Sequence, residues 1–97
     1  MQQYIIIAKD GTDANALARR LEYRPAHLAL MKSYKEAGTF ISGGATLDDS
    51  GNMIGSVVHM QFASKEAIDQ WIQEEPYIQG GVWERYEILP YRSATIV

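Results

Sequence analysis

The stretch Arg24–Phe40, RPAHLALMKSYKEAGTF, decides how this chain folds, because it reads as a helix that leads directly into a strand. Pro25 suits the first position of a helix, where its missing N–H is no loss. The residue before a proline is pushed away from the helical region, so the helix is expected to begin there and not earlier. Gly38 suits the position just after a helix. We therefore expect a helix over 25–37 and a strand that starts near Thr39.

One side of this expected helix carries apolar and aromatic residues. Their spacing is i, i+3, i+4 and i+7, which places them on a single face, and they are His27, Leu30, Met31 and Tyr34. Upstream, Ala14–Leu21 is expected to form two separate helical turns, which end before the proline. The sequence thus predicts a break between that short segment and the long helix.

The rest of the chain supplies three more strands and a second helix. Tyr4–Ala8, YIIIA, is typical of a central strand covered on both faces. Met53–Phe62 alternates polar and apolar residues and is expected to pair antiparallel with the strand before it, across a polar turn. Ser64 is an N-cap candidate for an amphipathic helix over 65–73. The last strand is expected over Val82–Tyr91.

The order β, α, β, β, α, β is the split βαβ, or ferredoxin-like, pattern. We expect an α+β fold, a single domain over 1–97, with both helices on one face of an antiparallel sheet. The other face would expose apolar and aromatic side chains, and such a surface normally finds a partner. A homodimer that stacks two sheets is the simplest closure. The space between sheet and helices would then be the ligand pocket.

Charge and composition exclude several classes of protein. The net charge is −3 and the basic residues are scattered, which argues against nucleic-acid binding. The chain has no cysteines and only two histidines, so we expect neither thiol chemistry nor a metal site. No segment reads as a signal peptide or membrane span, and a cytoplasmic location is the default expectation.

Six short motifs follow one another along the whole chain. They are Arg24-Pro25-Ala26-His27-Leu28, Glu36-Ala37-Gly38, Phe40-Ile41-Ser42-Gly43-Gly44, Gly55-Ser56-Val57-Val58, Glu75-Pro76-Tyr77 and Gly80-Gly81-Val82. No one of them is specific, but the ordered set resembles the YCII-related (YciI-like) family. The resemblance implies a dimeric α+β barrel of ferredoxin-like subunits. It also implies kinship with dehalogenase-like enzymes of chlorinated aromatic breakdown, which are related in fold to muconolactone isomerases.

The resemblance further implies an active site built on a histidine of the first helix and a nearby acidic residue. His27 matches that histidine. The family usually has aspartate before the Pro-aromatic pair, where this chain has Glu75, and it often has an acidic residue near the end of the first helix, where Glu36 lies. The sequence leaves open which of the two carboxylates is the partner.

The candidate residues have a coherent chemistry. An imidazole gains and loses protons near neutral pH, and a carboxylate beside it fixes its tautomer. A His27–carboxylate pair could remove a proton next to a carbonyl or assist the departure of halide. Arg24 could hold a substrate carboxylate with two hydrogen bonds. Ser56 could add a hydrogen bond, and Tyr77 an aromatic wall.

Two hypotheses of different class follow. The first is a cofactor-independent lyase, isomerase or dehalogenase-like enzyme acting on a small organic acid or lactone through His27 with Glu75 or Glu36. The alternative is a non-catalytic dimeric module that binds a small molecule or a protein partner. Each candidate also has a plain structural role: His27 at a helix edge, Glu75 at a helix end, and Tyr77 in the core or at the dimer interface.

Overall fold

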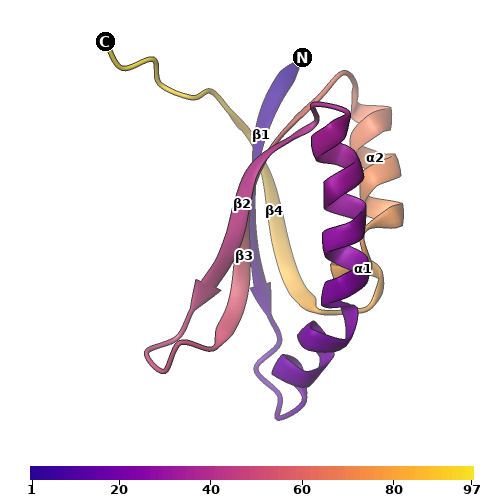
Figure 1. Ribbon diagram of the computed structural model, residues 1–97, viewed down its shortest axis with the longest axis vertical. Coiled ribbons are helices and arrows are strands. Elements are labelled where there is room, and N and C mark those ends of the chain that lie inside the picture. Colours follow the sequence, from indigo (N-terminus) through magenta and orange to yellow (C-terminus); the bar gives the residue numbers. More distant parts are fainter.

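A computed structural model describes residues 1–97 as a four-stranded sheet with its helices gathered on one side (Figure 1). The elements in chain order are β1 (Gln2–Asp10), α1 (Ala16–Glu36), β2 (Phe40–Leu47), β3 (Met53–Phe62), α2 (Lys65–Glu74), α3 (Pro76–Gln79) and β4 (Trp83–Tyr91).

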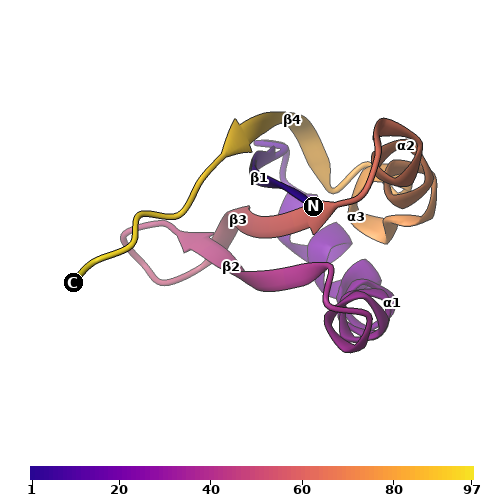
Figure 2. The same ribbon diagram turned by 90° about the horizontal axis from the view of Figure 1, so that it is seen from above.

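The strands lie in the order β2-β3-β1-β4, and every neighbouring pair is antiparallel. Viewed from above, all three helices lie on the same side of the sheet (Figure 2). This confirms the predicted α+β ferredoxin-like fold. It also confirms the pairing of β3 with the strand before it, with register shifts at each end of β2.

The predicted helix break before Pro25 is wrong. α1 runs without interruption from Ala16 to Glu36, with Pro25 inside it. Figure 1 shows the first turns set at an angle to the long upper part, as expected where a proline removes one backbone hydrogen bond. Buried side chains anchor the helix on both sides of the bend, Arg20 before it and Met31 after it. Tertiary packing of both halves on the same sheet therefore outweighs the local preference of proline.

The helix ends follow the predicted capping chemistry. Gly38 has a φ of +80°, and the N–H of Thr39 reaches back to the carbonyl of Tyr34 at 2.8 Å, which turns the chain from α1 into β2. At the start of α2, the Ser64 hydroxyl accepts a hydrogen bond from the Ala67 N–H at 3.2 Å.

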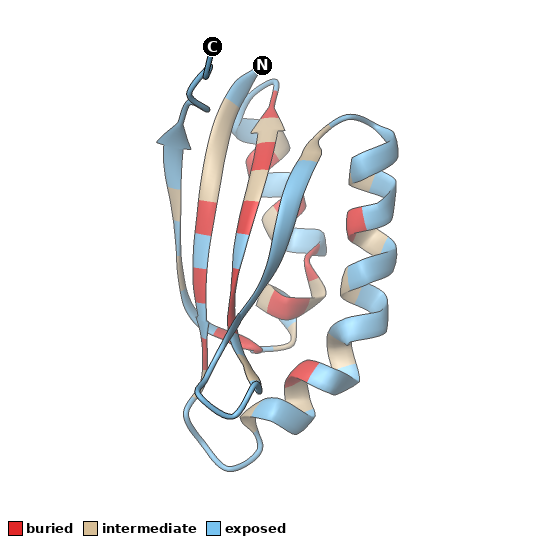
Figure 3. Ribbon diagram, turned by 60° about the vertical axis from the view of Figure 1, so that its left-hand side comes forward, coloured by how far each residue is buried: buried red, intermediate tan, exposed pale blue.

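The core lies between β1, β3 and the inner faces of the helices (Figure 3). Its largest fully buried side chains are Trp71, Tyr77, Ile6, Met60, Glu75 and Val82. Glu75 is the only charged member of this group. β2, by contrast, is exposed over almost its whole length. One charged side chain is therefore part of the core, while the edge strand β2 contributes little to it.

The face of the sheet away from the helices is open in the single chain. Ile7 and Leu89 on this face are each 41% exposed, and Val57 beside them is 38% exposed. β1 is central, as predicted, but it is covered on one face only, because no element of the chain packs on the other. Figure 2 shows the C-terminal segment leaving on this open side.

Candidate active site

His27 and Glu75 form a close pair at the inner end of the space between α1 and the sheet. The imidazole Nδ1 lies 2.6 Å from Glu75 Oε1. The His27 side chain is 12% exposed and that of Glu75 is 0% exposed. The two residues are 48 positions apart in the chain, so only the fold brings them together. Of the two carboxylates left open by the sequence, the structure places Glu75 against His27.

Local structure fixes the Glu75 carboxylate. The residue ends α2 and at the same time caps α3, where its Oε1 accepts a hydrogen bond from the Tyr77 backbone N–H at 3.0 Å. Glu75 thus ends a helix, as expected, and the same position also holds its carboxylate against His27. Since Oε1 already acts as an acceptor, the short contact is satisfied when His27 Nδ1–H donates to it. The other imidazole nitrogen, Nε2, is then left as the free, basic nitrogen.

The second oxygen of the Glu75 carboxylate, Oε2, is buried and has no hydrogen-bond partner. An unpaired buried carboxylate oxygen is unfavourable for folding, and such arrangements concentrate where a protein does chemistry.

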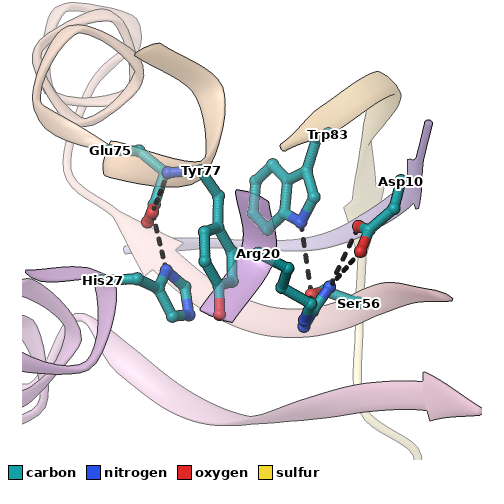
Figure 4. Close-up of polar contacts among 7 residues, drawn as sticks. All are labelled: Asp10, Arg20, His27, Ser56, Glu75, Tyr77 and Trp83. Carbon is teal, nitrogen blue, oxygen red and sulfur yellow. Dashed lines mark hydrogen bonds and ion pairs between the residues drawn. The ribbon is translucent and has the colours of Figure 1, made fainter. Parts of the chain in front are cut away.

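The ring of Tyr77 lies flat against His27. The two ring centres are 3.9 Å apart and the planes differ by 9°. On the other side of Tyr77, the guanidinium carbon of Arg20 lies 4.8 Å from the ring centre (Figure 4). Trp83 meets the Tyr77 ring edge-on at 5.8 Å. The aromatic ring is thus held between an imidazole and a guanidinium, with Trp83 against its edge.

Arg20 belongs to a second buried polar cluster. Its Nη1 donates to both carboxylate oxygens of Asp10, at 2.9 and 3.0 Å. Its Nη2 donates to the Ser56 hydroxyl oxygen at 2.8 Å, and Trp83 Nε1 donates to the same oxygen at 3.2 Å. Asp10, Arg20 and Ser56 are all buried, so this cluster forms a rigid floor beside Tyr77 (Figure 4).

A cavity of about 310 Å³ opens between α1, β2 and β3 above these residues. Its lining includes His27 and Tyr77, the small residues Gly43, Gly44 and Ala45, and the apolar side chains of Leu28, Met31, Phe40, Met53 and Val58. Four basic residues, Arg20, Arg24, Lys32 and Lys35, also line it, and no acidic residue does. The cavity therefore combines apolar walls with positive charge, which suits a small anionic ligand.

The other predicted site residues lie as follows. Arg24 lines the cavity and makes no hydrogen bond or ion pair within the chain, so its guanidinium is available to a ligand. Ser56 lines it too, but the protein itself uses the acceptor capacity of its hydroxyl. Glu36 is exposed at the far end of α1, nine residues from His27, or about 13 Å along the helix axis. The proposed pairing of His27 with Glu36 is therefore abandoned.

Sequence reasoning missed Arg20 and Asp10. The missed signal was the helical spacing of Arg20, Arg24 and His27, at i, i+4 and i+7, which puts all three on one face. The predicted break before Pro25 hid this spacing by placing Arg20 in a separate segment. Asp10, at the end of the first strand, has no comparable spacing signal in the sequence.

The structure gathers no group of three or more His, Asp or Glu side chains that could hold a metal ion. None of its helices combines the length and the apolar character that crossing a bilayer requires.

Fold and cavity together define a ferredoxin-like protein with a histidine–carboxylate pair beside a basic pocket. The sequence model of the YCII-related domain matches residues 2–92, and the chain belongs to this family. Protein YciI of Escherichia coli O6:H1 is 34% identical over 96 residues, which cover 93% of this chain and 96% of that protein.

Two solved structures share the fold. One is the 5-chloro-2-hydroxyhydroquinone dehydrochlorinase of Burkholderia phenoliruptrix AC1100 in complex with 2,5-dihydroxybenzoquinone, with a TM-score of 0.80, 23% identity and 95% of each chain covered. The other is a dimeric ferredoxin-like protein of unknown function from Jannaschia sp. CCS1, with a TM-score of 0.54, 10% identity, and 96% of this chain and 100% of that chain covered.

Proposed function

We propose that this protein is a cofactor-independent enzyme, a dehalogenase-like lyase or an isomerase, that uses the His27–Glu75 pair to move a proton on a small organic acid or lactone. The observation that carries the proposal is the 2.6 Å contact between His27 Nδ1 and the fully buried Glu75 carboxylate, at the wall of a basic cavity. The dehydrochlorinase activity of the structural neighbour supports the choice of reaction class.

In the proposed reaction His27 Nε2 takes a proton from the carbon next to a substrate carbonyl. The electron pair of that C–H bond forms a carbon–carbon double bond, and chloride leaves the adjacent carbon with the electrons of its own bond. In an isomerisation, the protonated imidazole returns the proton to a different carbon. Glu75 holds the tautomer and stabilises the imidazolium that forms in either case.

The remaining cavity residues bind the substrate. Arg24, free of partners, holds a carboxylate or another anionic group with two hydrogen bonds. Ser56 accepts from Arg20 and Trp83, which leaves its own O–H proton for a ligand oxygen. Tyr77 forms an aromatic wall beside the reacting atoms.

We also propose that the functional unit is a homodimer. The open sheet face carries the exposed apolar residues Ile7, Val57 and Leu89 at its centre. A second copy is the simplest cover for this face, and the Jannaschia protein of the same fold is dimeric. Light scattering at micromolar concentration should give twice the mass of one chain, and a monomeric mass would contradict the proposal.

The enzyme proposal is tested by chloride release from chlorinated hydroxyhydroquinones and by proton exchange on lactones, measured with wild type and His27→Gln. The variant should lose about 10²–10⁴-fold in turnover, the usual contribution of a general base. Its circular dichroism and mass in solution should match those of wild type. An unchanged rate in a folded H27Q dimer would rule out the proposed role. Binding of these compounds with no turnover in wild type would favour the non-catalytic alternative.

A further inference from the structure

Tyr77 is the only one of the six tyrosines that is buried. The residue is 1% exposed and lines the cavity, yet its O–H makes no hydrogen bond to any protein group. Tyr34, seven residues after His27 on the same helix face, is the one tyrosine whose hydroxyl has a partner in the chain, and it donates to Glu74 at 2.9 Å. A buried tyrosine usually finds a partner for its O–H. The open position beside Tyr77 is the cavity itself.

The Tyr77 ring has little freedom to turn away. The His27 imidazole stacks on one side at 3.9 Å, and the Arg20 guanidinium lies over the ring at 4.8 Å. Glu75 Oε1 binds both the backbone N–H of Tyr77 and the imidazole of His27, so one oxygen atom fixes the positions of both residues. In Figure 4 the Tyr77 hydroxyl and the free nitrogen of His27 lie at the same edge of the stacked pair.

The charge around this edge favours an oxygen that carries or gains negative charge. The charged side chains that line the cavity are Arg20, Arg24, Lys32 and Lys35, and none is acidic. Burial raises the pKa of the Tyr77 hydroxyl, although Arg20 and Arg24 oppose the shift. The phenol therefore keeps its proton at neutral pH and acts as a hydrogen-bond donor.

We propose that the Tyr77 hydroxyl is the donor that binds a substrate oxygen beside His27 Nε2, and that the substrates are carbonyl or phenolic compounds whose oxygen becomes anionic during the reaction. This inference rests on the proposed function. As His27 Nε2 removes the proton from the carbon next to the carbonyl, the electron pair of that C–H bond forms a C=C bond to the carbonyl carbon. The carbonyl π pair moves to oxygen, and the resulting C–O⁻ accepts the hydrogen bond from Tyr77 without taking its proton. In the elimination the carbonyl then re-forms from the pair on oxygen, and the pair of the enolate C=C bond moves to form the new C=C bond as chloride leaves with the electrons of its own bond. Donors already in place at a developing oxyanion are a strong source of catalysis.

The test uses 4-nitrophenolate, a planar anion whose single charged oxygen stands in for the enolate. Its binding and its absorbance are measured with wild type, Tyr77→Phe and Tyr34→Phe. Y77F keeps the stacked ring and loses only the donor, so affinity should fall about tenfold or more, as for hydrogen bonds to charged groups. Y34F, which removes a hydroxyl outside the cavity, should bind like wild type.

A second measurement keeps the test independent of the stability of Y77F. In wild type, the absorbance maximum of the bound probe should stay near its position in water, since a donor still reaches the oxygen. A maximum shifted to longer wavelength, as in solvents without donors, would overturn the inference. So would the absence of probe binding by wild type, equal affinity of Y77F, or an equal loss in Y34F.

The two proposals fail separately. If His27→Gln leaves turnover unchanged while Y77F weakens the probe, the proton-transfer role of His27 is wrong and the oxygen-binding role of Tyr77 stands. If H27Q abolishes turnover while Y77F binds the probe like wild type, the enzyme proposal stands and the present inference is overturned.

Discussion

Arg20 and His27 lie seven residues apart on one face of α1, and each contacts a buried acidic residue from elsewhere in the chain. The Arg20–Asp10 pair is closed, because both side chains are less than 5% exposed and Arg20 reaches Ser56 as well. The His27–Glu75 pair is open on one side, because the imidazole is 12% exposed and its Nε2 has no partner within the chain. A guanidinium keeps its charge at any ordinary pH, whereas an imidazole does not.

The two pairs on this one helix therefore have different roles, one in stability and the other, in our proposal, in chemistry. The permanent ion pair anchors the first turns of α1 and supports Tyr77 from behind. The titratable pair holds one imidazole nitrogen and leaves the other available to a ligand. The same helix face thus serves for stability at one turn and, in our proposal, for proton transfer two turns later.

The largest effect on stability is expected from Arg20→Met. This change leaves the Asp10 carboxylate buried without its partner, which typically costs about 3–5 kcal/mol in the free energy of unfolding. Urea unfolding followed by the fluorescence of Trp71 and Trp83 would measure the loss. Arg19→Met is the matched control, because the neighbouring Arg19–Asp13 pair is exposed and should contribute nothing measurable.

The double variant Asp10→Asn with Arg20→Met sharpens this prediction. Removing the buried charge together with its partner should restore part of the stability lost in R20M, because the penalty arises from an uncompensated carboxylate. Equal losses in R20M and R19M would show that the closed pair is not what anchors the helix.

The next largest effect is expected on activity from Glu75→Gln. An amide can donate to His27 Nδ1 and so favour the other tautomer, and turnover should fall by about 10²-fold or more. Glu36→Gln is the matched control at an exposed position of α1 and should retain the wild-type rate. The same steady-state assay measures both, and a larger loss in E36Q than in E75Q would contradict the choice of carboxylate.

The smallest effect is expected on the pH dependence of stability, from a change at Tyr34. This residue lies seven positions after His27 on the same face of α1. Burial, with a hydrogen bond to Glu74, raises the pKa of Tyr34 to about 12. An unfolded tyrosine ionises near pH 10, so the folded chain holds more protons between pH 10 and 12, and stability must fall as pH rises through this range. Tyr34→Phe should lessen that fall, and thermal unfolding at pH 9, 10 and 11 would show it. An identical pH dependence in Y34F and wild type would contradict the assignment.

The sequence was sufficient for the architecture because each element carries its own local signal. The alternation of β3, the Ser64 cap and the Gly38 turn all act within a few residues, and the structure confirms each of them. Local sequence preferences could not predict that α1 continues past Pro25. The helix is stabilised there by the burial of Arg20 and Met31 against a sheet made of residues distant in the sequence.

The candidate site was only partly predictable. His27 and Glu75 were both identified, yet nothing local distinguishes Glu75 from Glu36, since the choice depends on how α2 ends against α1. The Asp10–Arg20 contact depends on where β1 ends relative to the first turns of α1, and no spacing rule reports that distance.

The proposed proton transfer depends on Glu75 accepting a hydrogen bond from His27 Nδ1–H, which leaves Nε2 as the free base. A two-dimensional ¹H–¹⁵N NMR spectrum of the imidazole, recorded at a pH where His27 is neutral, tests this without any substrate. We expect a protonated Nδ1 and an unprotonated Nε2 for His27 in wild type, and a loss of this preference in Glu75→Gln. A proton on Nε2 in the wild-type protein would contradict it.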